Sequence, residues 1–176
     1  MVRTRTTVFA AVSLDGYLAT TDDGLEWLES AANPDDDHGF DDLVGSVDAV
    51  AMGRRTWDHI AAIEHLPYQD LPVFVFTRRP PTATRAGVTF WECSPERAVA
   101  AWTEAGYHRV YIDGGEVVSS FLAARLVDDR TVTVVPTLLG DGRPLFRPIE
   151  RSTALEFLGA TTFDSGLVTL RYRTHR

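Results

Sequence analysis

The chain contains no lysine, so all 17 of its basic residues are arginine. Without a lysine amine, Schiff-base chemistry and the lysine of a phosphate-binding P-loop are both excluded, which removes pyridoxal enzymes and Walker-type kinases. A single cysteine, Cys93, cannot form an internal disulfide and fits a reducing compartment. The five histidines show no metal-ligand spacing. We therefore expect no metal site.

Net positive charge is also lacking, because the formal net charge is −8. A nucleic-acid surface is not expected, since phosphate contacts need a basic face. The apolar stretch that follows Thr7 is broken by Ser13, Asp15 and Gly16, so it is neither a signal peptide nor a membrane span. We expect a cytoplasmic protein without a membrane or nucleic-acid partner, in which any bound anion is small and locally held.

The order of apolar and polar segments predicts the fold class. With 176 residues, 44% of them hydrophobic, the chain can bury one sizeable core, and we expect a single domain over residues 1–176. Strands are predicted at 6–13, 47–52, 72–77, 88–91 and 109–113, and helices at 25–31, 55–63, 95–104 and 114–126, with a loop at 14–24. Strands at 131–135, 155–163 and 167–173 follow without a helix between them. The prediction is a three-layer α/β/α fold whose mixed, mostly parallel sheet ends in an antiparallel hairpin.

Three of the predicted strands end in segments that suit an anionic ligand: 52–56 (MGRRT), 77–79 (TRR) and 113–115 (DGG). In an open parallel sheet, ligands bind outside the carboxyl ends of the strands. The two glycines let the backbone approach a diphosphate at a helix N-terminus, and the arginines can grip a further phosphate. Each arginine pair alone is also compatible with a solvated helix start. The coincidence of three such ends favours an elongated anionic ligand.

These segments resemble a known superfamily. MGRRTW is similar to the MGR-[KR]-TW segment of dihydrofolate reductases, and VFTRRP and YIDGGEVVSSFL resemble the two later cofactor segments of that superfamily. SLDGYLA followed by WL, and the late PTLLGDGRPLF, are more similar to its other branch, which includes the reductase domain of the bifunctional riboflavin-biosynthesis protein. The resemblance runs from 11 to 146. It implies a dihydrofolate-reductase-like fold and hydride transfer from NADPH.

The resemblance also implies which residues hold NADPH. Those along the phosphates would be Gly53, Arg54, Arg55 and Thr56; those at the adenosine 2′-phosphate Thr77, Arg78 and Arg79; those at the diphosphate turn Gly114, Gly115 and Glu116; and those near the nicotinamide Leu18 and Ala19. Because a carboxylate repels a diphosphate, we expect the Glu116 side chain to point away from it.

The resemblance departs from dihydrofolate reductases at the carboxylate that holds the pterin ring, whose position falls on Ala32. Dihydrofolate is therefore predicted to be a poor substrate. Asp37 and its neighbours could substitute from the next helix, with a solvated acidic helix start as the alternative; these neighbours are Asp35, Asp36, Asp41 and Asp42. Asp15 is a second candidate, or else a turn-forming aspartate. Trp27 is a third, or else an aromatic of the core or pocket wall.

The sequence thus predicts an NADPH-dependent reductase of a small heterocyclic, pteridine- or pyrimidine-like, or carbonyl substrate. Two alternatives remain, a riboflavin-pathway phosphoribosylaminopyrimidine reductase and a non-catalytic NADP-binding sensor or interaction module. PTLLGDGRPLF places Leu138, Leu139, Leu145 and Phe146 in a segment too apolar for a free loop. This segment predicts a homodimer, with the alternative that the last hairpin of the same chain folds back over it.

Overall fold

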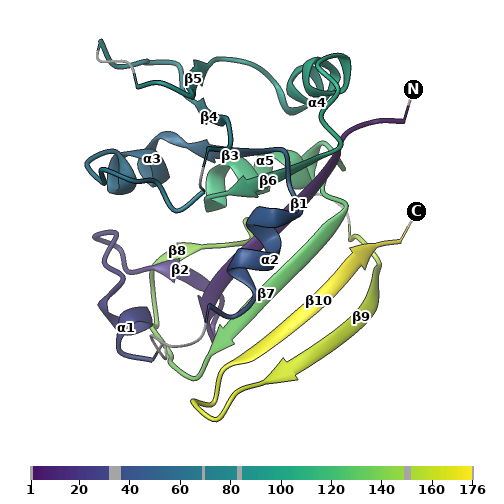
Figure 1. Ribbon diagram of the computed structural model, residues 1–176. Coiled ribbons are helices and arrows are strands. Elements are labelled where there is room, and N and C mark those ends of the chain that lie inside the picture. Colours follow the sequence, from purple (N-terminus) through teal and green to yellow (C-terminus); the bar gives the residue numbers. More distant parts are fainter. Residues whose placement is uncertain (1, 32–36, 69, 83–84, 149–151, 176) are drawn as a thin grey trace.

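The computed structural model describes residues 2–31, 37–68, 70–82, 85–148 and 152–175. Its centre is an eight-stranded sheet of order β5-β4-β3-β6-β1-β7-β10-β9 (Figure 1). The strands are β1 (Arg5–Ser13), β3 (Ala49–Gly53), β4 (Val73–Phe76), β5 (Val88–Trp91), β6 (Arg109–Asp113), β7 (Asp129–Val135), β9 (Leu155–Thr162) and β10 (Val168–Thr174). The strands from β5 to β7 pair in parallel, and β10 pairs antiparallel with β7 and β9. The predicted mixed sheet with an antiparallel hairpin is confirmed.

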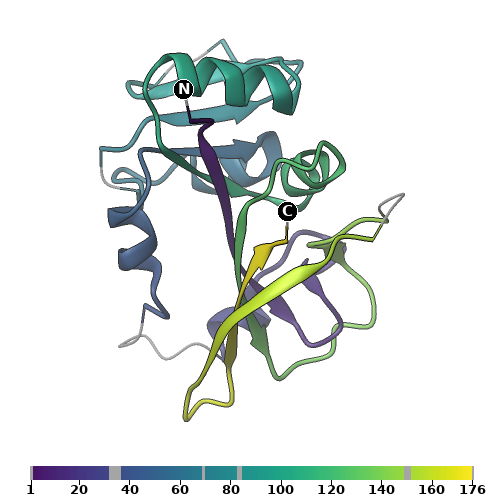
Figure 2. The same ribbon diagram turned by 90° about the vertical axis from the view of Figure 1, so that its right-hand side faces the viewer.

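Helices cover both faces of the parallel strands (Figure 2). They are α1 (Glu26–Glu29), α2 (Phe40–Gly45), α3 (Arg54–Ile60), α4 (Pro95–Glu104) and α5 (Gly115–Ala123). On one face α2 and α3 contribute Leu43 and Trp57 to the core, and on the other α4 and α5 contribute Trp102 and Phe121, whose rings stack 6.0 Å apart. Burial on both faces explains why the strand segment 49–52 is apolar throughout. The three-layer prediction is confirmed, and no helix in the described ranges has the length and apolar character needed to cross a lipid bilayer.

A second, two-stranded sheet was not predicted. It consists of β2 (Tyr17–Ala19) and β8 (Arg143–Pro144), so the expected loop at 14–24 is corrected to a loop that contains a strand. Its partner strand lies far along the chain, which is why a local pattern rich in turn residues did not reveal it. Gly142 permits the pairing, because a Cβ there would lie 2.3 Å from the Ala19 carbonyl oxygen. The small sheet places Leu18 and Pro144 against Gly115 at the start of α5.

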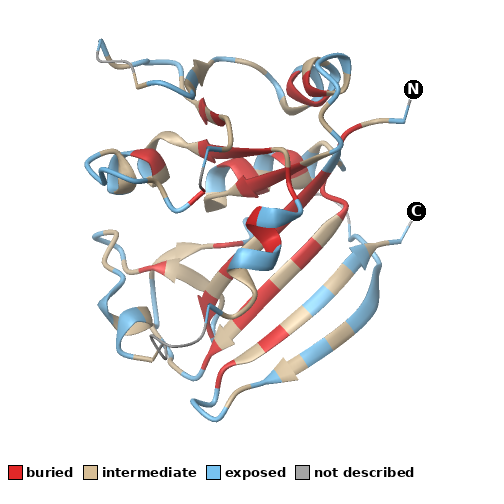
Figure 3. Ribbon diagram, viewed as in Figure 1, coloured by how far each residue is buried: buried red, intermediate tan, exposed pale blue. Residues whose placement is uncertain are grey.

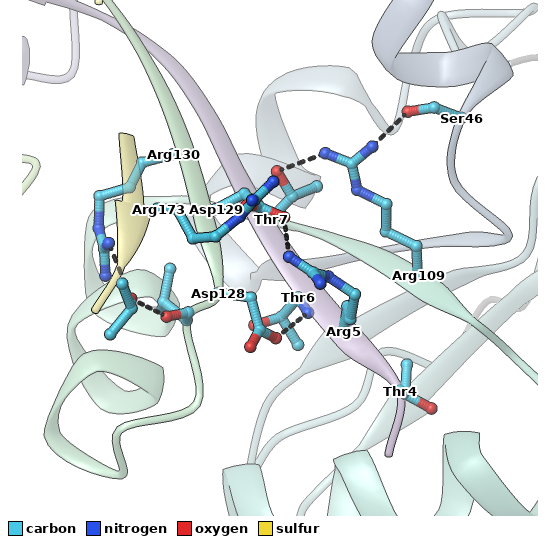
Figure 4. A network of polar contacts seen from close by, with 12 residues as sticks. Thr4, Arg5, Thr6, Thr7, Ser46, Arg109, Asp128, Asp129, Arg130 and Arg173 are labelled. Carbon is cyan, nitrogen blue, oxygen red and sulfur yellow. Dashed lines mark hydrogen bonds and ion pairs between the residues drawn. The ribbon is translucent and has the colours of Figure 1, made fainter. Parts of the chain in front are cut away.

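Polar contacts close the amino-terminal end of the large sheet (Figure 4). Arg5 of β1 and Arg173 of β10 both pair with Asp129 of β7, at 2.9 and 3.0 Å. Asp128 accepts a hydrogen bond from the backbone N–H of Thr6 at 2.8 Å. These pairs bind the C-terminal hairpin to the first strand at this end of the sheet.

The hairpin strand β9 lies at the edge of the sheet, and no helix in the described part of the chain covers it (Figure 3). Phe157 in β9 is 59% exposed, and Leu138 and Phe146 of the predicted apolar segment are 70% and 47% exposed. Leu145 of the same segment is buried in the core of its own chain. The backbone N–H of Leu145 donates to the Gly16 carbonyl at 3.1 Å, next to the pairing of β8 with β2. These backbone contacts direct the Leu145 side chain into the core.

A candidate cofactor crevice and an adjoining pocket

Three parallel strand ends meet at one edge of the sheet, as predicted. In the middle strand β3, Gly53 pairs with Phe76 of β4 and Met52 pairs with Asp113 of β6. The segments that follow these strands therefore leave the sheet side by side, two of them directly into α3 and α5 (Figure 1). The carboxyl ends of the strands thus bring the glycine- and arginine-containing segments together.

A crevice of about 780 Å³ follows these strand ends. Most of the predicted cofactor residues line it, namely Gly53, Arg54, Arg55, Thr56, Thr77, Arg78, Gly114 and Glu116. Sequence reasoning missed the far end of the crevice, where Phe76, Trp91, Glu92, Cys93 and Ser94 contribute. A signal for them was present in the sequence, because the residues after the predicted strand 88–91 would leave a parallel sheet at the same edge.

A second hollow of about 550 Å³ adjoins the crevice and is lined by Arg54, Thr77, Arg78 and Arg79. Arg54 donates to Asp58 at 2.7 Å and to the Arg79 carbonyl at 2.9 Å, which holds the turn after β4 against α3. Arg78 is exposed and has no hydrogen-bond or ion-pair partner within the described ranges. Three guanidinium groups surround one hollow, and two of them, those of Arg78 and Arg79, have no hydrogen-bond or ion-pair partner within the described ranges, which suits a phosphate group.

The start of α5 forms one wall of the crevice. Gly114, which precedes the helix, has a φ of 83°, and no side chain caps the first turn. The first backbone N–H groups of the helix are therefore left without intrahelical partners, at the positive end of the helix dipole. Since Gly114, Glu116 and Val117 all line the crevice, this turn can accept an anionic group.

Glu116 lies at the boundary between the crevice and a neighbouring pocket. Its Oε1 atom is 3.0 Å from a guanidinium nitrogen of Arg147 and 3.7 Å from one of Arg55. We expected this side chain to point away from a bound diphosphate. The carboxylate turns toward the two arginines, which offset its charge at the boundary, and the expectation stays a prediction.

The neighbouring pocket has a volume of about 380 Å³ and is mainly apolar. Its walls include Phe9, Leu25, Leu28, Ile60, Tyr68 and Tyr111, together with the predicted nicotinamide neighbours Leu18 and Ala19 and the predicted Gly115. It shares Arg55, Thr56, Gly114 and Glu116 with the crevice. A ligand that lies along the strand ends can therefore extend from the polar crevice into an apolar pocket.

Asp113, the last residue of β6, supplies a half-buried carboxyl group to this pocket. Burial raises the pKa of Asp113 to about 6, although a hydrogen bond from the Gly114 N–H, at 2.7 Å, acts in the opposite direction. Tyr68 and Tyr111 lie beside it, and burial raises the pKa of both phenols. Sequence reasoning missed Asp113 as a functional carboxyl, because it treated DGG only as a phosphate-binding turn.

The three predicted catalytic residues do not line the crevice or the pocket. Asp15 accepts hydrogen bonds from Ser13 Oγ at 2.6 Å and from the Gly140 N–H at 2.7 Å, and the Ser13 contact lowers its pKa. Its position matches the turn-forming alternative. Asp37 is exposed and accepts from the N–H groups of Gly39 and Asp41, at 3.0 and 2.7 Å, at the start of α2.

Trp27 is half-buried in α1, between Leu25 and Leu28, which do line the pocket. Trp27 itself lines neither cavity and belongs to neither core cluster, so the structure supports neither a catalytic contact nor a place in the pocket wall. Exposed Asp41 and Asp42 lie in the first turn of α2. Ala32, Asp35 and Asp36 lie outside the described residues. Within the described ranges, Asp113 is therefore the acid that the structure places at the pocket without an arginine partner.

This fold and this edge of the sheet define a dihydrofolate-reductase-like protein. The dihydrofolate reductase of Enterococcus faecalis, in a complex with NADP(H), superimposes with a TM-score of 0.69 over 99% of this chain and 100% of that one, at 17% identity. More specifically, the chain belongs to the RibD C-terminal domain family, whose model matches residues 5–169.

Two similar proteins agree with this assignment. A protein from Shewanella sp. PV-4 assigned to riboflavin biosynthesis has a TM-score of 0.90 and 32% identity, over 98% of this chain and 99% of that one. The uncharacterized protein YwjB of Bacillus subtilis (strain 168) is 33% identical over 165 residues, which cover 93% of this chain and 94% of YwjB. Family and fold support a reductase-type function.

Proposed function

We propose that this chain is an NADPH-dependent reductase that transfers hydride to a small heterocyclic, pteridine- or pyrimidine-like, or carbonyl substrate. The observation that carries the proposal is the junction of the two cavities. The crevice and the pocket share four lining residues, so a cofactor along the strand ends would direct its reactive end toward an apolar pocket with a half-buried carboxyl group. The Enterococcus enzyme, which has the same fold, was solved with NADP(H).

The residues present fit such a cofactor. The hollow around Arg78 offers cations to a 2′-phosphate, and the uncapped start of α5 at Gly114 offers N–H donors to a diphosphate. Leu18 lies against Gly115, because a Cβ added to this glycine would be 3.3 Å from the Leu18 side chain. Both residues line the pocket where it joins the crevice. Bound NADPH would supply the hydride.

The chain itself would supply the proton and the environment. When hydride adds to the carbon of a C=N or C=O bond, the nitrogen or oxygen of that bond must take up a proton. Protonated Asp113 can donate it and become a carboxylate, and its pKa of about 6 keeps part of the population protonated near neutral pH. The side chains of Phe9, Ile60 and Tyr68 around it exclude water from the reacting atoms.

The test measures binding and turnover separately. NADPH affinity is measured by quenching of tryptophan fluorescence, and NADPH oxidation is then followed with a panel of pteridines, aminopyrimidines and small carbonyl compounds. We expect Asp113→Asn to retain NADPH affinity and lose turnover, because an amide cannot donate the proton. Asp37→Asn is the matched control, since its carboxylate lies outside both cavities.

Each other outcome has a defined meaning. Full turnover by Asp113→Asn would remove this residue from the mechanism, and failure to bind NADPH would reject the reductase. Tight NADPH binding with no oxidation across the panel would favour the non-catalytic NADP-binding module.

A further inference from the structure

The mouth of the apolar pocket carries three arginines, and each faces a carboxylate of the same chain. Arg143 of β8 donates from Nε to Asp23 at 2.7 Å and from a terminal nitrogen to the Thr21 carbonyl, also at 2.7 Å. Arg147 and Arg55 share the carboxylate of Glu116. The cations at this mouth are therefore already engaged.

The backbone conformation and the ion pair of Asp23 both fix its position. It lies in the turn between β2 and α1 with a φ of 69°, a left-handed conformation that aspartate and asparagine tolerate better than most residues. The hydrogen bond from Arg143 lowers the pKa of Asp23, so its carboxylate is ionised at neutral pH. This pair ties the turn to β8 at the rim of the pocket.

The charges at the pocket offset one another. Arg55, Arg143 and Arg147 contribute three positive charges, Asp23 and Glu116 contribute two negative ones, and Asp113 contributes a third whenever it is ionised. The lining also includes His59. The walls between the rim and Asp113 are aliphatic and aromatic. The complement of this pocket is a compact, uncharged ring whose N–H groups can donate to the carboxyl group at its floor.

We infer that the substrate is an uncharged nitrogen heterocycle without a phosphate or carboxylate tail, and that Asp23 sets this preference by occupying Arg143. The inference rests on the proposed function, because it takes the pocket to be the substrate site. An anionic tail at the rim would meet Asp23 and Glu116, and such like-charge contacts oppose binding. The phosphoribosylated substrate of the riboflavin-pathway alternative is disfavoured for this reason.

The experiment uses probes that differ by one phosphate. Isothermal titration calorimetry is performed on the full chain saturated with NADP⁺, so that the nucleotide crevice is filled, with pterin, uridine and uridine 5′-phosphate. We expect the wild type to bind uridine at least about tenfold more tightly than its phosphate, since like charges at an interface cost this much or more.

Asp23→Asn should shift this ratio by about tenfold toward uridine 5′-phosphate, because it removes the negative charge that faces Arg143 and keeps a residue that tolerates the left-handed turn. Asp22→Asn is the matched control. It removes the neighbouring charge, but Asp22 accepts from the Thr20 hydroxyl and does not line the pocket. The control should leave the ratio as it is in the wild type.

Three results would overturn the inference: a wild type that prefers uridine 5′-phosphate, a ratio unchanged by Asp23→Asn, or no binding of either pterin or uridine. Titration of NADP⁺ into the nucleotide-free protein, before it is saturated for these measurements, separates the two proposals. Normal NADP⁺ binding with an unexpected ratio rejects only the substrate class, whereas loss of NADP⁺ binding in the wild type rejects the proposed reductase.

Discussion

Gly114 and Thr56 approach so closely that a Cβ on Gly114 would lie 2.6 Å from Thr56 Oγ1. The contact joins the turn between β6 and α5 to the first turn of α3, and both residues line the crevice and the pocket. Gly114 also has a φ of 83°, which disfavours any residue with a side chain. The junction of the two cavities therefore depends on a glycine at this position.

Gly114→Ala should lower the free energy of unfolding by about 2 to 3 kcal/mol, the sum of a left-handed backbone penalty and a steric contact. It should also weaken NADPH binding. Gly106→Ala is the control, because its φ is 84° and nothing lies within 4 Å of its added Cβ. The free energy of unfolding of Gly106→Ala should fall by only about 1 kcal/mol. Urea denaturation measures the free energy of unfolding of both variants. Equal decreases would show that the contact with Thr56 does not contribute to stability.

Arg78→Ala should weaken the binding of NADPH by about 1.5 to 3 kcal/mol, the range for a hydrogen bond to a charged group, with little change for NADH. The reason is the hollow lined by Arg54, Arg78 and Arg79, which suits a 2′-phosphate. Fluorescence titration with both cofactors is the measurement. Arg97→Ala, which removes an exposed arginine outside the crevice, should change neither affinity. Equal affinities of the wild type for NADPH and NADH would contradict the phosphate site.

Asp113→Asn should change the pH dependence of stability. The pKa of Asp113 rises from 3.8 to about 6 on folding, so the fold favours the protonated form. Its contribution to stability is fully present below pH 3.8 and is lost as the pH rises through about 6. The free energy of unfolding of Asp113→Asn relative to wild type should therefore increase between pH 4 and pH 7, by up to about 3 kcal/mol. Parallel pH profiles in urea denaturation would show that Asp113 is not desolvated.

Dihydrofolate should be a poor substrate. Its glutamate tail carries carboxylates, which would meet Asp23 and Glu116 at the rim of the pocket. Ala32, where the pterin-holding acid of dihydrofolate reductases would fall, adds no carboxylate. Steady-state assays with NADPH should show turnover of dihydrofolate far below that of an uncharged pteridine, and robust turnover or tight antifolate binding would refute this prediction.

We propose that the chain forms a homodimer through its distal part, in which a second copy covers the segment 136–146, with its exposed Leu138 and Phe146, and the strands after it. The outer edge of β9 is unpaired in the described structure, and Leu155, Phe157 and Leu158 on it are 42%, 59% and 43% exposed. An open apolar strand edge is a template for pairing with another chain, and a twofold axis makes such a contact self-limiting. Phe146, which is 47% exposed, adds to the apolar surface outside the core.

Sedimentation at micromolar concentration should give twice the chain mass. Phe146→Asp should give a monomer with NADPH affinity largely intact, because Phe146 lies outside the crevice. Ile63→Asp, at a site 45% exposed that follows α3, is the control and should remain dimeric. If the wild type sediments as a monomer, the proposed interface is rejected. If Phe146→Asp remains a dimer, the interface does not include Phe146.

The sequence by itself determined the alternation of strands and helices and the edge at which a nucleotide would bind. These features depend on local signals: apolar runs such as 49–52, the Ser94-Pro95 helix start, and the arginines and glycines that directly follow the strands. The predicted helix 95–104 matches α4, since Ser94 accepts from the Arg97 N–H and Pro95 suits the first turn.

Only the tertiary structure decided which carboxylates belong to the pocket. Asp37 accepts from the N–H of Asp41 close by in the chain, and Asp15 accepts from the N–H of Gly140, which is distant in sequence. Asp113 instead lies half-buried beside aromatic residues from several elements. The pairing of β2 with β8 likewise joins segments from opposite halves of the chain and brings Arg143 to Asp23. Desolvation and ion pairing depend on neighbours that are distant in sequence, and for this reason no local pattern could assign these roles.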